Sequence, residues 1–411
     1  MAAANSDQTQ WHTFTCGEEE YTVPIRYKDP KKIGYGAFGA VAQMTDTVTG
    51  KIVAIKKLIQ PFRGTEYAKR AYRELKLLMH LDHPGMHIVR LLNVFTPNNN
   101  LREFETFYLV MKYAGVDLNR IIKRHAFTEE HIKQIIYSIL RALKVGVFYE
   151  NYSLPYNTNG FVALQFQFAH SAEILHRDLK PSNIGIDEDS NLTILDFGLG
   201  RVAADGDKTG YVQTRWWRAP DIYTNWQRYD DKLDMWSVGC IMGELILRKP
   251  IFPGKDHTDH LKKIFEIIGT PDRSTLDEIC TPDVVEFISK MPRQVGQNFN
   301  ELFGYKYAAG NPQPTSGISP VGVDLLRHLL TFNHFDRPTA EEALAHPFLT
   351  GFHNPEDEPT LDSLVDEHQN ACYNVEKWKS IIWELIQRFE EPVVDADDDN
   401  DDMDTDSQNI P

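Results

Sequence analysis

The sequence of 411 residues is poor in cysteine and has no long apolar run. Its four cysteines, Cys16, Cys240, Cys280 and Cys372, are too widely spaced for a CxxC metal or redox motif. We therefore expect free thiols in a reducing compartment, either cytoplasm or nucleus. No apolar stretch reaches the roughly 18 residues of a membrane span, and the first residues lack the regions of a signal peptide. Membrane insertion and secretion are accordingly not expected.

Basic residues are also scarce: 43 Lys and Arg stand against 59 Asp and Glu, for a net charge of -16. This balance argues against direct nucleic acid binding, which needs clustered Lys and Arg. Half of the net charge lies in residues 395–411, which contain eight Asp and neither Lys nor Arg. We expect a solvated tail there. Hydrophobic residues (42%) and charged residues (25%) are otherwise at globular levels.

Strand patterns occupy the first part of the chain and helical patterns the rest. Short β-branched segments predict strands at 21–25, 31–36, 41–45, 52–57, 91–95 and 106–111. Apolar spacings of three and four predict helices over 67–81, 129–144, 259–268 and 321–330, and one more after Asp231. This order predicts an α+β fold in which a small sheet-rich lobe precedes a larger helical lobe. A cleft between two lobes is a natural ligand site.

Gly34, Gly36 and Gly39 lie between two predicted strands and do not open a helix, which disfavours a dinucleotide-binding fold. Their amides can approach a phosphate closely, although a simple hairpin turn accounts for them equally well. On the next predicted strand, Lys56 ends the apolar run Val-Ala-Ile-Lys and needs an anionic partner. Glu74 of the following helix is a candidate, with ordinary surface charges as the alternative.

The most specific motif is His176-Arg-Asp-Leu-Lys-Pro-Ser-Asn183, followed by Asp196-Phe-Gly. It combines a carboxylate for a substrate hydroxyl, a lysine for a transferring phosphate, and Asn and Asp oxygens suited to magnesium. So many ordered matches do not arise by chance.

In this order the motifs resemble those of the eukaryotic protein kinases. The resemblance implies a bilobal protein kinase fold, a C-terminal extension that packs back on the small lobe, and ATP and Mg2+ as cofactors. It implies that Asp178 deprotonates the substrate hydroxyl, Lys180 neutralises the moving phosphoryl group, and Asn183 and Asp196 hold magnesium. It also implies that Lys56 contacts the α and β phosphates and pairs with Glu74. Thr214 would hydrogen-bond to Asp178 and Lys180. Asp234 would support the backbone of the catalytic loop.

The resemblance also implies an ATP pocket. Met111 would be the gatekeeper beside adenine, which is a packing role as well, and Asp117 would meet the ribose. The pocket residues implied are Ile33, Gly34, Gly36, Gly39, Val41, Ala54, Lys56, Met111 and Asp117.

The segment from Gly198 to Thr209 is 12 residues long. It leads into Thr209-Gly-Tyr211, which precedes a Trp-Trp-Arg-Ala-Pro segment. This arrangement resembles the mitogen-activated protein kinases, and the Gly points to their stress-activated, osmosensing branch. It implies that phosphorylation of Thr209 and Tyr211 switches the enzyme on, because each phosphate adds charge that guanidinium groups can bind. Arg70, Arg73, Arg177 and Arg201 would gather on the first phosphate, and Arg215 and Arg218 on the second.

The same resemblance implies partners. The turn 212–218 resembles that of kinases acting on Ser or Thr followed by Pro. Glu188, Asp189, Glu356 and Asp357 match positions that capture basic docking peptides, although surface acids are usually only solvated. We expect an upstream dual-specificity kinase, phosphatases and scaffolds with basic docking motifs, a monomer, and a cytoplasmic and nuclear location.

The expected division is an N-terminal extension (1–26), a small lobe (27–111), a large lobe (112–350), a C-terminal extension with a docking patch (351–390), and an acidic disordered tail (391–411). Four residues depart from the family pattern. Asp221 replaces a Glu and needs a shorter reach to Arg337; Gly200 replaces an Ala; Trp217 replaces a Tyr and loses a hydroxyl; Asn354 replaces an acid.

A fifth departure is larger, because residues 145–167 split a helix expected to be buried. One hypothesis is a surface insertion, which ordinarily occurs at exposed tips. We favour the other, a retained intron of 69 nucleotides. Val145-Gly-Val can be encoded with a GT donor, Thr158-Asn159 as a branch-point-like ACTAAC, and Phe166-Gln167 with a CAG acceptor. A second hypothesis for function, an inactive kinase-fold scaffold, rests on this segment alone.

Overall fold

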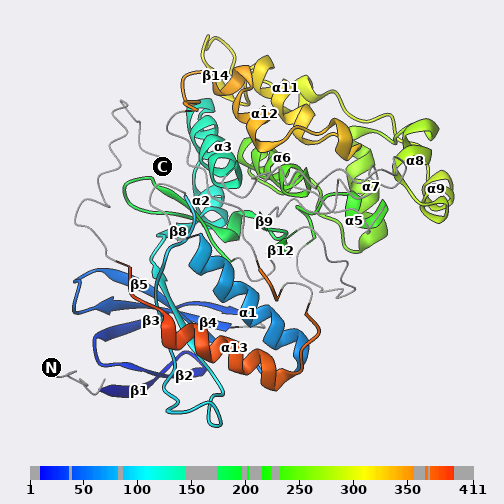
Figure 1. Ribbon diagram of the computed structural model, residues 1–411. Helices are drawn as coiled ribbons and strands as arrows, with labels where there is room; N and C mark the ends of the chain where they lie inside the picture. Colours follow the sequence, from blue (N-terminus) through cyan, green and yellow to red (C-terminus); the bar gives the residue numbers. More distant parts are fainter. Residues whose placement is uncertain are drawn as a thin grey trace. The chain divides into compact units, whose positions relative to one another are not determined.

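The computed structural model describes residues 10–36, 39–81, 87–144, 174–196, 201–202, 215–224, 232–355, 366–368 and 371–392. The chain divides into two compact units (Figure 1). Unit 1 comprises Met1–Pro84, Val89–Ala114 and Ala371–Asp402, and unit 2 comprises Gly85–Ile88, Gly115–Asn370 and Met403–Pro411. Within the described ranges, no helix is both long enough and apolar enough to cross a membrane.

Unit 1 is built on an antiparallel sheet of five strands in the order β3-β4-β5-β7-β6. A separate hairpin of two strands, β1 and β2, precedes it in the chain. The strands are β1 (Trp11–Cys16), β2 (Glu19–Pro24), β3 (Tyr27–Gly36), β4 (Gly39–Asp46), β5 (Ile52–Leu58), β6 (Leu91–Phe95) and β7 (Tyr108–Lys112). The alternation of buried side chains along β4 gives the sheet two distinct faces.

One face of this sheet packs against the β1–β2 hairpin. Tyr21 and Val23 of β2 share a buried cluster with Ala42, Met44 and Ile55 of the sheet. The first strand was not predicted, since its apolar residues Trp11, Phe14 and Cys16 do not alternate regularly with polar ones. The remaining strand predictions of this region correspond to observed strands, with ends that differ by a few residues.

Two helices lie side by side in unit 1, α1 (Thr65–His80) and α13 (Val375–Arg388), drawn blue and red in Figure 1. Trp378 of α13 is fully buried, and its ring lies 5.0 Å from that of Tyr72 on α1. Just beyond α13, Glu391 accepts hydrogen bonds from Arg26 at 2.9 Å and from Asn93 at 2.5 Å. The C-terminal extension therefore packs back on the small lobe, as the family resemblance implies.

Unit 2 is mainly helical. Its helices are α2 (Leu118–Arg124), α3 (Glu129–Lys144), α5 (Asp221–Thr224), α6 (Lys232–Leu247), α7 (His257–Ile268), α8 (Arg273–Ile279), α9 (Pro282–Ser289), α10 (Phe299–Phe303), α11 (Pro320–Leu329) and α12 (Ala340–Leu344), with 3₁₀ turns η1 (Pro181–Asn183), η3 (His334–Asp336) and η4 (Pro347–Leu349). Helix α6 is apolar on all sides because it is buried along most of its length. It forms the centre of the unit, in contact with α3, α10 and α11.

Short strands support the loops of unit 2. They are β8 (Val116–Asp117), β9 (Ile174–Leu175), β10 (Ile184–Ile186), β11 (Leu192–Ile194), β12 (Arg201–Val202), β13 (Lys306–Tyr307) and β14 (Pro314–Ser316). Strand β10 pairs with both β8 and β11. Gly115, just before β8, has φ +73°, and a side chain there would lie 2.0 Å from the carbonyl oxygen of Ile186. Only glycine fits that close approach.

Helix α3 is described as far as Lys144, the last residue before the segment 145–167, and residues 145–173 lie outside the described residues. Residues 11–24 belong to unit 1 together with the sheet, and the C-terminal extension is shared between the units at Asn370 and Ala371.

Candidate active site

The predicted ion pair between Lys56 and Glu74 is present in unit 1. Lys56 Nζ donates to Glu74 Oε1, and the two side chains are only 12% and 4% exposed. Glu74 lies on the buried stripe of α1, so the helix holds its carboxylate against β5. A side chain at position 39 would lie 3.1 Å from Lys56 Cε and 2.9 Å from the carbonyl oxygen of Lys57. Gly39 therefore leaves room for the lysine.

The register of the sheet brings the predicted ATP-pocket residues of unit 1 together. Gly34 faces Val41 across the strands, and Val41 faces Lys56. Ala54 faces Met111 on β7. Because side chains two residues apart share a face of a strand, Val41, Ala54, Lys56 and Met111 all lie on one face of the sheet.

The glycine hairpin is formed as predicted, with Gly36 opposite Gly39. Ile33 is half-buried at the bulge that shifts the register between Lys32 and Gly34. The tip of the hairpin, residues 37 and 38, lies outside the described residues.

In unit 2 the side chains of the catalytic motif converge on Asp178. Lys180 Nζ donates to Asp178 Oδ2 at 2.5 Å, and the Asn183 amide donates to the Asp178 carbonyl oxygen at 2.9 Å and to Oδ2 at 3.3 Å. The 3₁₀ turn η1 carries Asn183 back toward Asp178. Asp178 and Asn183 are buried and Lys180 is partly so, which makes these contacts stronger than they would be in water.

Asp234, at the start of α6, supports the backbone of this loop. Its two carboxylate oxygens accept the N–H groups of His176 at 2.7 Å and Arg177 at 2.9 Å. Burial raises the pKa of the Asp234 carboxyl, and the two N–H donors and the nearby His176 and Arg177 act in the opposite direction. Arg177 has a positive φ of 66°, a conformation that non-glycine residues adopt only when their surroundings impose it.

The same loop fixes the backbone before Asp196. His176 Nε2 contacts the Leu195 carbonyl oxygen at 2.8 Å, and the Leu195 N–H donates to the Asn183 carbonyl oxygen at 2.8 Å. Asp196 is exposed and also has a positive φ, 61°. The two residues predicted to hold magnesium are thus tied together through Leu195.

Asp117 has a structural task that the sequence reasoning missed. It is the N-cap of α2 and accepts the Arg120 N–H at 3.0 Å, while Arg120 Nε lies 2.9 Å from its other oxygen. Such a cap satisfies an N–H group that the first turn of a helix leaves open. The signal was available, because Asp directly precedes the apolar pattern Leu118, Ile121 and Ile122.

The phosphorylation sites Thr209 and Tyr211, together with Thr214 and Gly200, lie outside the described residues. Of the six arginines predicted to bind phosphate, Arg70 and Arg73 lie on α1 and Arg177 beside Asp178. Arg201 opens β12, and its side chain is not described. Arg215 and Arg218 form the two ends of one turn, closed by a 3.1 Å hydrogen bond from the Arg218 N–H to the Arg215 carbonyl oxygen.

The predicted docking acids are described only in part. Glu188 and Asp189 are exposed in the turn between β10 and β11, whereas Glu356 and Asp357 lie outside the described residues.

Two of the departures from the family pattern have structural counterparts. Arg337 reaches the shorter Asp221, with Nη2 2.9 Å from Oδ2, and is itself fully buried. Trp217 Nε1 donates to Glu244 Oε2 at 2.8 Å. The indole N–H of Trp217 thus supplies a hydrogen-bond donor at the position where the usual Tyr has a hydroxyl. Glu244 was missed by the sequence reasoning, although it is the only charged residue in the largely apolar stretch 235–247 of α6, and this was a signal that could have found it.

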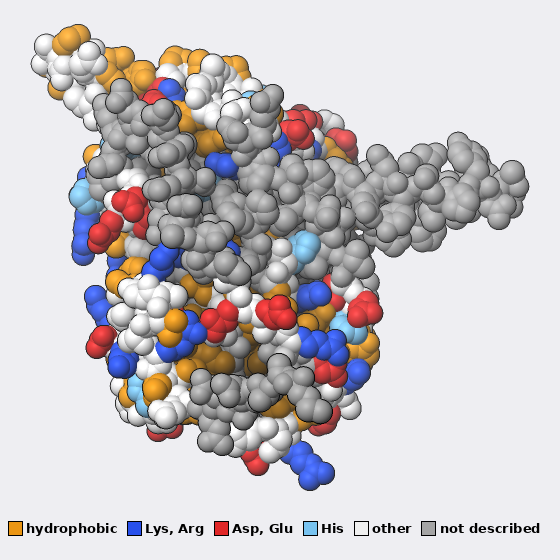
Figure 2. All heavy atoms as spheres, turned by 60° about the vertical axis from the view of Figure 1, so that its left-hand side comes forward, with side chains coloured by type: hydrophobic (Ala, Val, Ile, Leu, Met, Phe, Trp, Pro, Cys, Tyr) orange, Lys and Arg blue, Asp and Glu red, His pale blue; other side chains and the backbone are white. Residues whose placement is uncertain are grey.

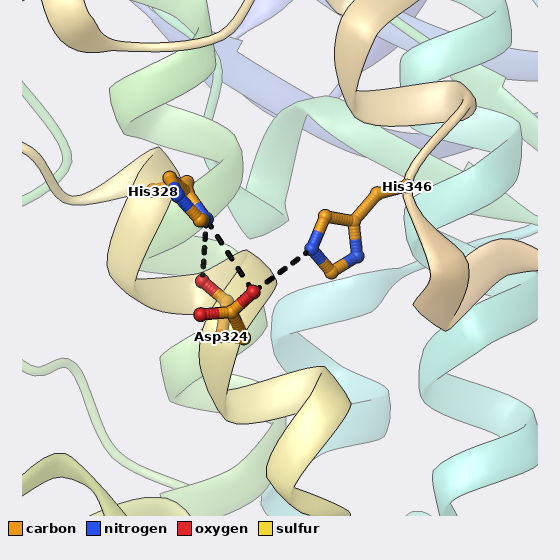
Figure 3. A group of neighbouring side chains, drawn as sticks. All are labelled: Asp324, His328 and His346. Carbon is orange, nitrogen blue, oxygen red and sulfur yellow. Dashed lines mark hydrogen bonds and ion pairs between the residues drawn. The ribbon is translucent and has the colours of Figure 1, made fainter.

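Asp324, His328 and His346 form a cluster on and beside α11 (Figure 3). One ligand atom from each lies within 4.8 Å of the others. His346 Nδ1 accepts the Phe348 N–H at 3.2 Å, so Nε2 carries the ring proton and donates to Asp324 at 3.3 Å. His328 Nδ1 is 3.0 Å from the Asp324 carbonyl oxygen and donates to it. The nitrogens that face Asp324 are therefore donors, which favours a hydrogen-bonded group over a metal site.

On the face shown in Figure 2, acidic and basic side chains are interspersed among the described residues. Binding to a nucleic acid backbone needs a continuous basic track. Among the described residues, this face shows no continuous basic track. That the protein has no nucleic acid partner stays a prediction.

Comparison with known proteins identifies the class. A model of the protein kinase domain matches residues 27–146 and 160–349. The chain is 39% identical over 378 residues to Mitogen-activated protein kinase 14 of Xenopus laevis, covering 92% of this chain and 94% of that protein. It is also 39% identical over 381 residues to Mitogen-activated protein kinase pmk-1 of Caenorhabditis elegans, covering 93% and 91%.

The kinase fold and the catalytic loop around Asp178 define a Ser/Thr protein kinase. The chain belongs to the mitogen-activated protein kinase family, in its stress-activated group. The matched ranges leave out residues 147–159, which fall within the 145–167 segment singled out in the sequence.

Proposed function

We propose that this kinase transfers the γ-phosphoryl group of ATP to Ser or Thr followed by Pro, and that phosphorylation of both Thr209 and Tyr211 activates it. The observation that supports phosphoryl transfer best is the convergence of Lys180 and Asn183 on the Asp178 carboxylate. A buried carboxylate with a cation on one oxygen is suited to orient a hydroxyl and to accept its proton.

In this proposal Asp178 positions the substrate hydroxyl and takes its proton as the oxygen attacks the γ-phosphorus. Lys180 balances the charge on the phosphoryl group as the bond to the β-phosphate oxygen breaks. Lys56, held by Glu74, contacts the α and β phosphates. These groups act mainly through position and charge, because phosphoryl transfer needs little covalent chemistry from the protein.

The donor set fits the expected Mg2+. Asn183 uses its amide nitrogen on Asp178, which leaves its amide oxygen available, and Asp196 is an exposed carboxylate. Magnesium prefers hard oxygen ligands of this kind, and bound Mg2+ neutralises phosphate charge. The backbone hydrogen bond from Leu195 to Asn183 links Asn183 to the residue before Asp196, which supports a joint role of the two side chains.

Activation is proposed to work through charge. Two phosphates add about -3 to -4 in total near neutral pH. Arg70, Arg73, Arg177 and Arg201 would bind the phosphate on Thr209, and the pair Arg215 and Arg218 that on Tyr211. The turn that holds the last two supports this, since it places both arginines at the ends of one short segment.

The proposed partners are an upstream dual-specificity kinase, proteins with Ser/Thr-Pro sites, and phosphatases and scaffolds with basic docking motifs. The exposed acids Glu188 and Asp189 support the last of these. We also propose that the enzyme is a monomer and works in the cytoplasm and nucleus.

The test compares phosphoryl transfer from ATP and Mg2+ to a Ser-Pro peptide and to a matched Ser-Ala peptide. Four forms of the full chain are used: unmodified, phosphorylated on both residues, and the Thr209→Ala and Tyr211→Phe variants after the same treatment. We expect rapid transfer to the Ser-Pro peptide only from the doubly phosphorylated chain.

The Asp178→Asn variant should be inactive in every form. Equal activity toward both peptides would contradict the proline preference, and full activity of the unmodified chain would contradict the switch. A silent doubly phosphorylated chain, when a chain lacking residues 145–167 is also silent, would favour the scaffold hypothesis.

A further inference from the structure

Four dipeptides in this chain match the target that is proposed for the enzyme itself, a Ser or Thr followed by Pro. They are Thr96-Pro97, Thr270-Pro271, Thr281-Pro282 and Ser319-Pro320, and all four lie within the described residues. A kinase modifies a residue of this kind only when its hydroxyl reaches solvent and the fold does not hold it in other contacts. The surroundings of the four hydroxyl groups therefore show which of them is open to modification.

Two of the threonine hydroxyls are engaged in hydrogen bonds of the fold. Thr96 is only 9% exposed, and its Oγ1 donates to the Thr106 carbonyl oxygen at 2.8 Å. Thr270 is half-buried, and its Oγ1 accepts the Gln294 N–H at 2.9 Å. A phosphate on Thr96 removes the proton that its bond needs, and a phosphate on Thr270 competes for space with the Gln294 contact. Both modifications would cost hydrogen bonds that are shielded from water.

Ser319 is held by two contacts. Its Oγ accepts the Gly322 N–H at 3.3 Å as the N-cap of α11, and its own N–H donates to Glu129 Oε2 at 2.5 Å. A phosphate on Ser319 would displace the cap and would bring about two negative charges close to the Glu129 carboxylate. The fold therefore disfavours modification at this position as well.

Thr281 differs from the other three. It is exposed in the connection between α8 and α9 (Figure 1), and its hydroxyl makes no capping hydrogen bond although it is the N-cap residue of α9. Cys280 and Thr281 are both extended, with φ and ψ of -108° and 155° and of -70° and 152°. Pro282 favours this conformation, because a proline disfavours the helical region for the residue before it. The Thr-Pro pair is thus presented to solvent in an extended segment.

The start of α9 is also a favourable place for a phosphate. The first turn of a helix leaves N–H groups open and carries a partial positive charge, which stabilises an anion. Asp283 in this turn has a charge of the same sign as the phosphate, but it is exposed, and charges in solvent are screened. Modification of Thr281 removes no capping hydrogen bond, so the fold is expected to tolerate it.

We propose that Thr281 is a modification site of this protein, phosphorylated by a second, active copy of the same kinase. The bond from Thr281 Oγ1 to the γ-phosphorus of ATP forms as the bond to the β-phosphate oxygen breaks. The hydroxyl proton passes to Asp178 of the acting copy, and ADP leaves. This inference rests on the proposed function, because it takes from that function the preference for Thr followed by Pro. It adds a substrate, which is an exposed segment of the large lobe.

The test uses full-length chains in both roles. The substrate is the Asp178→Asn chain in large excess, because it should not modify itself, and the enzyme is the doubly phosphorylated parent chain with ATP and Mg2+. Peptide mass spectrometry locates each phosphate on the substrate chain, which separates Thr281 from Thr209 and Tyr211. We expect Thr281 to be phosphorylated on most substrate chains, and Thr96, Thr270 and Ser319 to stay unmodified.

Three further changes in the Asp178→Asn substrate separate the parts of the site. Thr281→Val removes the hydroxyl, and Pro282→Ala keeps the hydroxyl but removes the residue that the enzyme is proposed to read. Ala is accepted at the first position of a helix, so α9 should stay formed in the latter. Thr270→Val is the matched control, because it removes a Thr-Pro hydroxyl that the fold already engages. We expect incorporation at position 281 to be absent in Thr281→Val, to fall roughly tenfold or more in Pro282→Ala, and to be unchanged in Thr270→Val.

The Ser-Pro peptide in the same reaction distinguishes the possible failures. If the peptide is phosphorylated and Thr281 is not, this inference is wrong and the proposed function stands. If neither is phosphorylated, the proposed function fails and this inference fails with it. Equal incorporation into Pro282→Ala and its parent would overturn the proline-directed modification of Thr281. Phosphate found on Thr270 or Ser319 in place of Thr281 would show that the contacts of the hydroxyl do not select the site.

Discussion

Arg337 Nη2 lies 2.9 Å from Asp221 Oδ2, with both side chains almost completely buried. The guanidinium also donates to the carbonyl oxygens of Lys232 at 2.6 Å and Thr331 at 3.1 Å. One arginine thereby joins α5, the start of α6 and the segment after α11. The Asp in this chain makes the contact that the usual Glu was expected to make.

Removing this partner should be costly, because it leaves a buried guanidinium without its counterion. We expect Asp221→Ala to lower the free energy of unfolding by about 3–5 kcal/mol. Urea denaturation of the parent and the variant measures this loss of unfolding free energy. The control is Asp277→Ala, which breaks the exposed pair with Arg273 and should change stability by no more than about 0.5 kcal/mol. Equal losses in the two variants would show that burial of the first pair does not matter.

Neighbouring lysines offer a matched test of catalysis. Lys56 is paired with Glu74, whereas Lys57 points to the other side of β5 and pairs with Glu19 at 2.9 Å. We expect Lys56→Met to reduce kcat by on the order of 10²-fold or more, because a preorganised charge at the phosphates is lost. Lys57→Met should stay close to the parent in steady-state assays. A comparable loss in both would argue against a specific role of Lys56.

The free energy of unfolding should depend on pH in a way that reports the raised pKa of Glu244. Its folded pKa of about 7 lies above the ordinary value of 4.5, so the folded chain binds the proton more tightly than the unfolded chain. The resulting stabilisation is complete below pH 4.5 and is lost as the pH rises to 7, a change of about 3 kcal/mol. The neighbouring charges are Lys123 on α2 and, when ionised, Cys240 on α6.

Glu244→Gln cannot titrate, so its stability relative to the parent should rise between pH 5 and pH 8. Urea denaturation of both proteins at intervals of one pH unit gives the difference and cancels the other titrating groups. Parallel curves would mean that Glu244 keeps an ordinary pKa in the folded protein.

The segment 145–167 leads to a prediction about the transcript. Helix α3 is described as far as Lys144, and an insertion that interrupts a buried helix leaves carbonyl oxygens in need of partners. Under the intron hypothesis, most cDNA reads lack these 69 nucleotides, and the shortened protein unfolds at a higher urea concentration than the full chain. If most reads retain the codons, the segment is a true insertion and the hypothesis fails.

Much of the candidate site could be predicted from residue types and their order along the chain. Lys56, Asp178, Asn183 and Asp196 are recognisable because the chemistry requires these residue types at these spacings. Helix α3 was predicted over its described residues, since its apolar positions form one continuous stripe. The first strand was missed, because its pairing with β2 and not its composition makes it a strand.

The sequence by itself determined the family, the order of the motifs and which side chains are candidates for catalysis. These depend on residue type and spacing, which are local and visible. The tertiary structure alone decided that Asp221 still reaches Arg337, that Asp117 caps helix α2, and that Glu244 receives the Trp217 indole. Contacts of this kind join residues far apart in the chain, and the packing that brings them within hydrogen-bonding distance is a property of the whole fold.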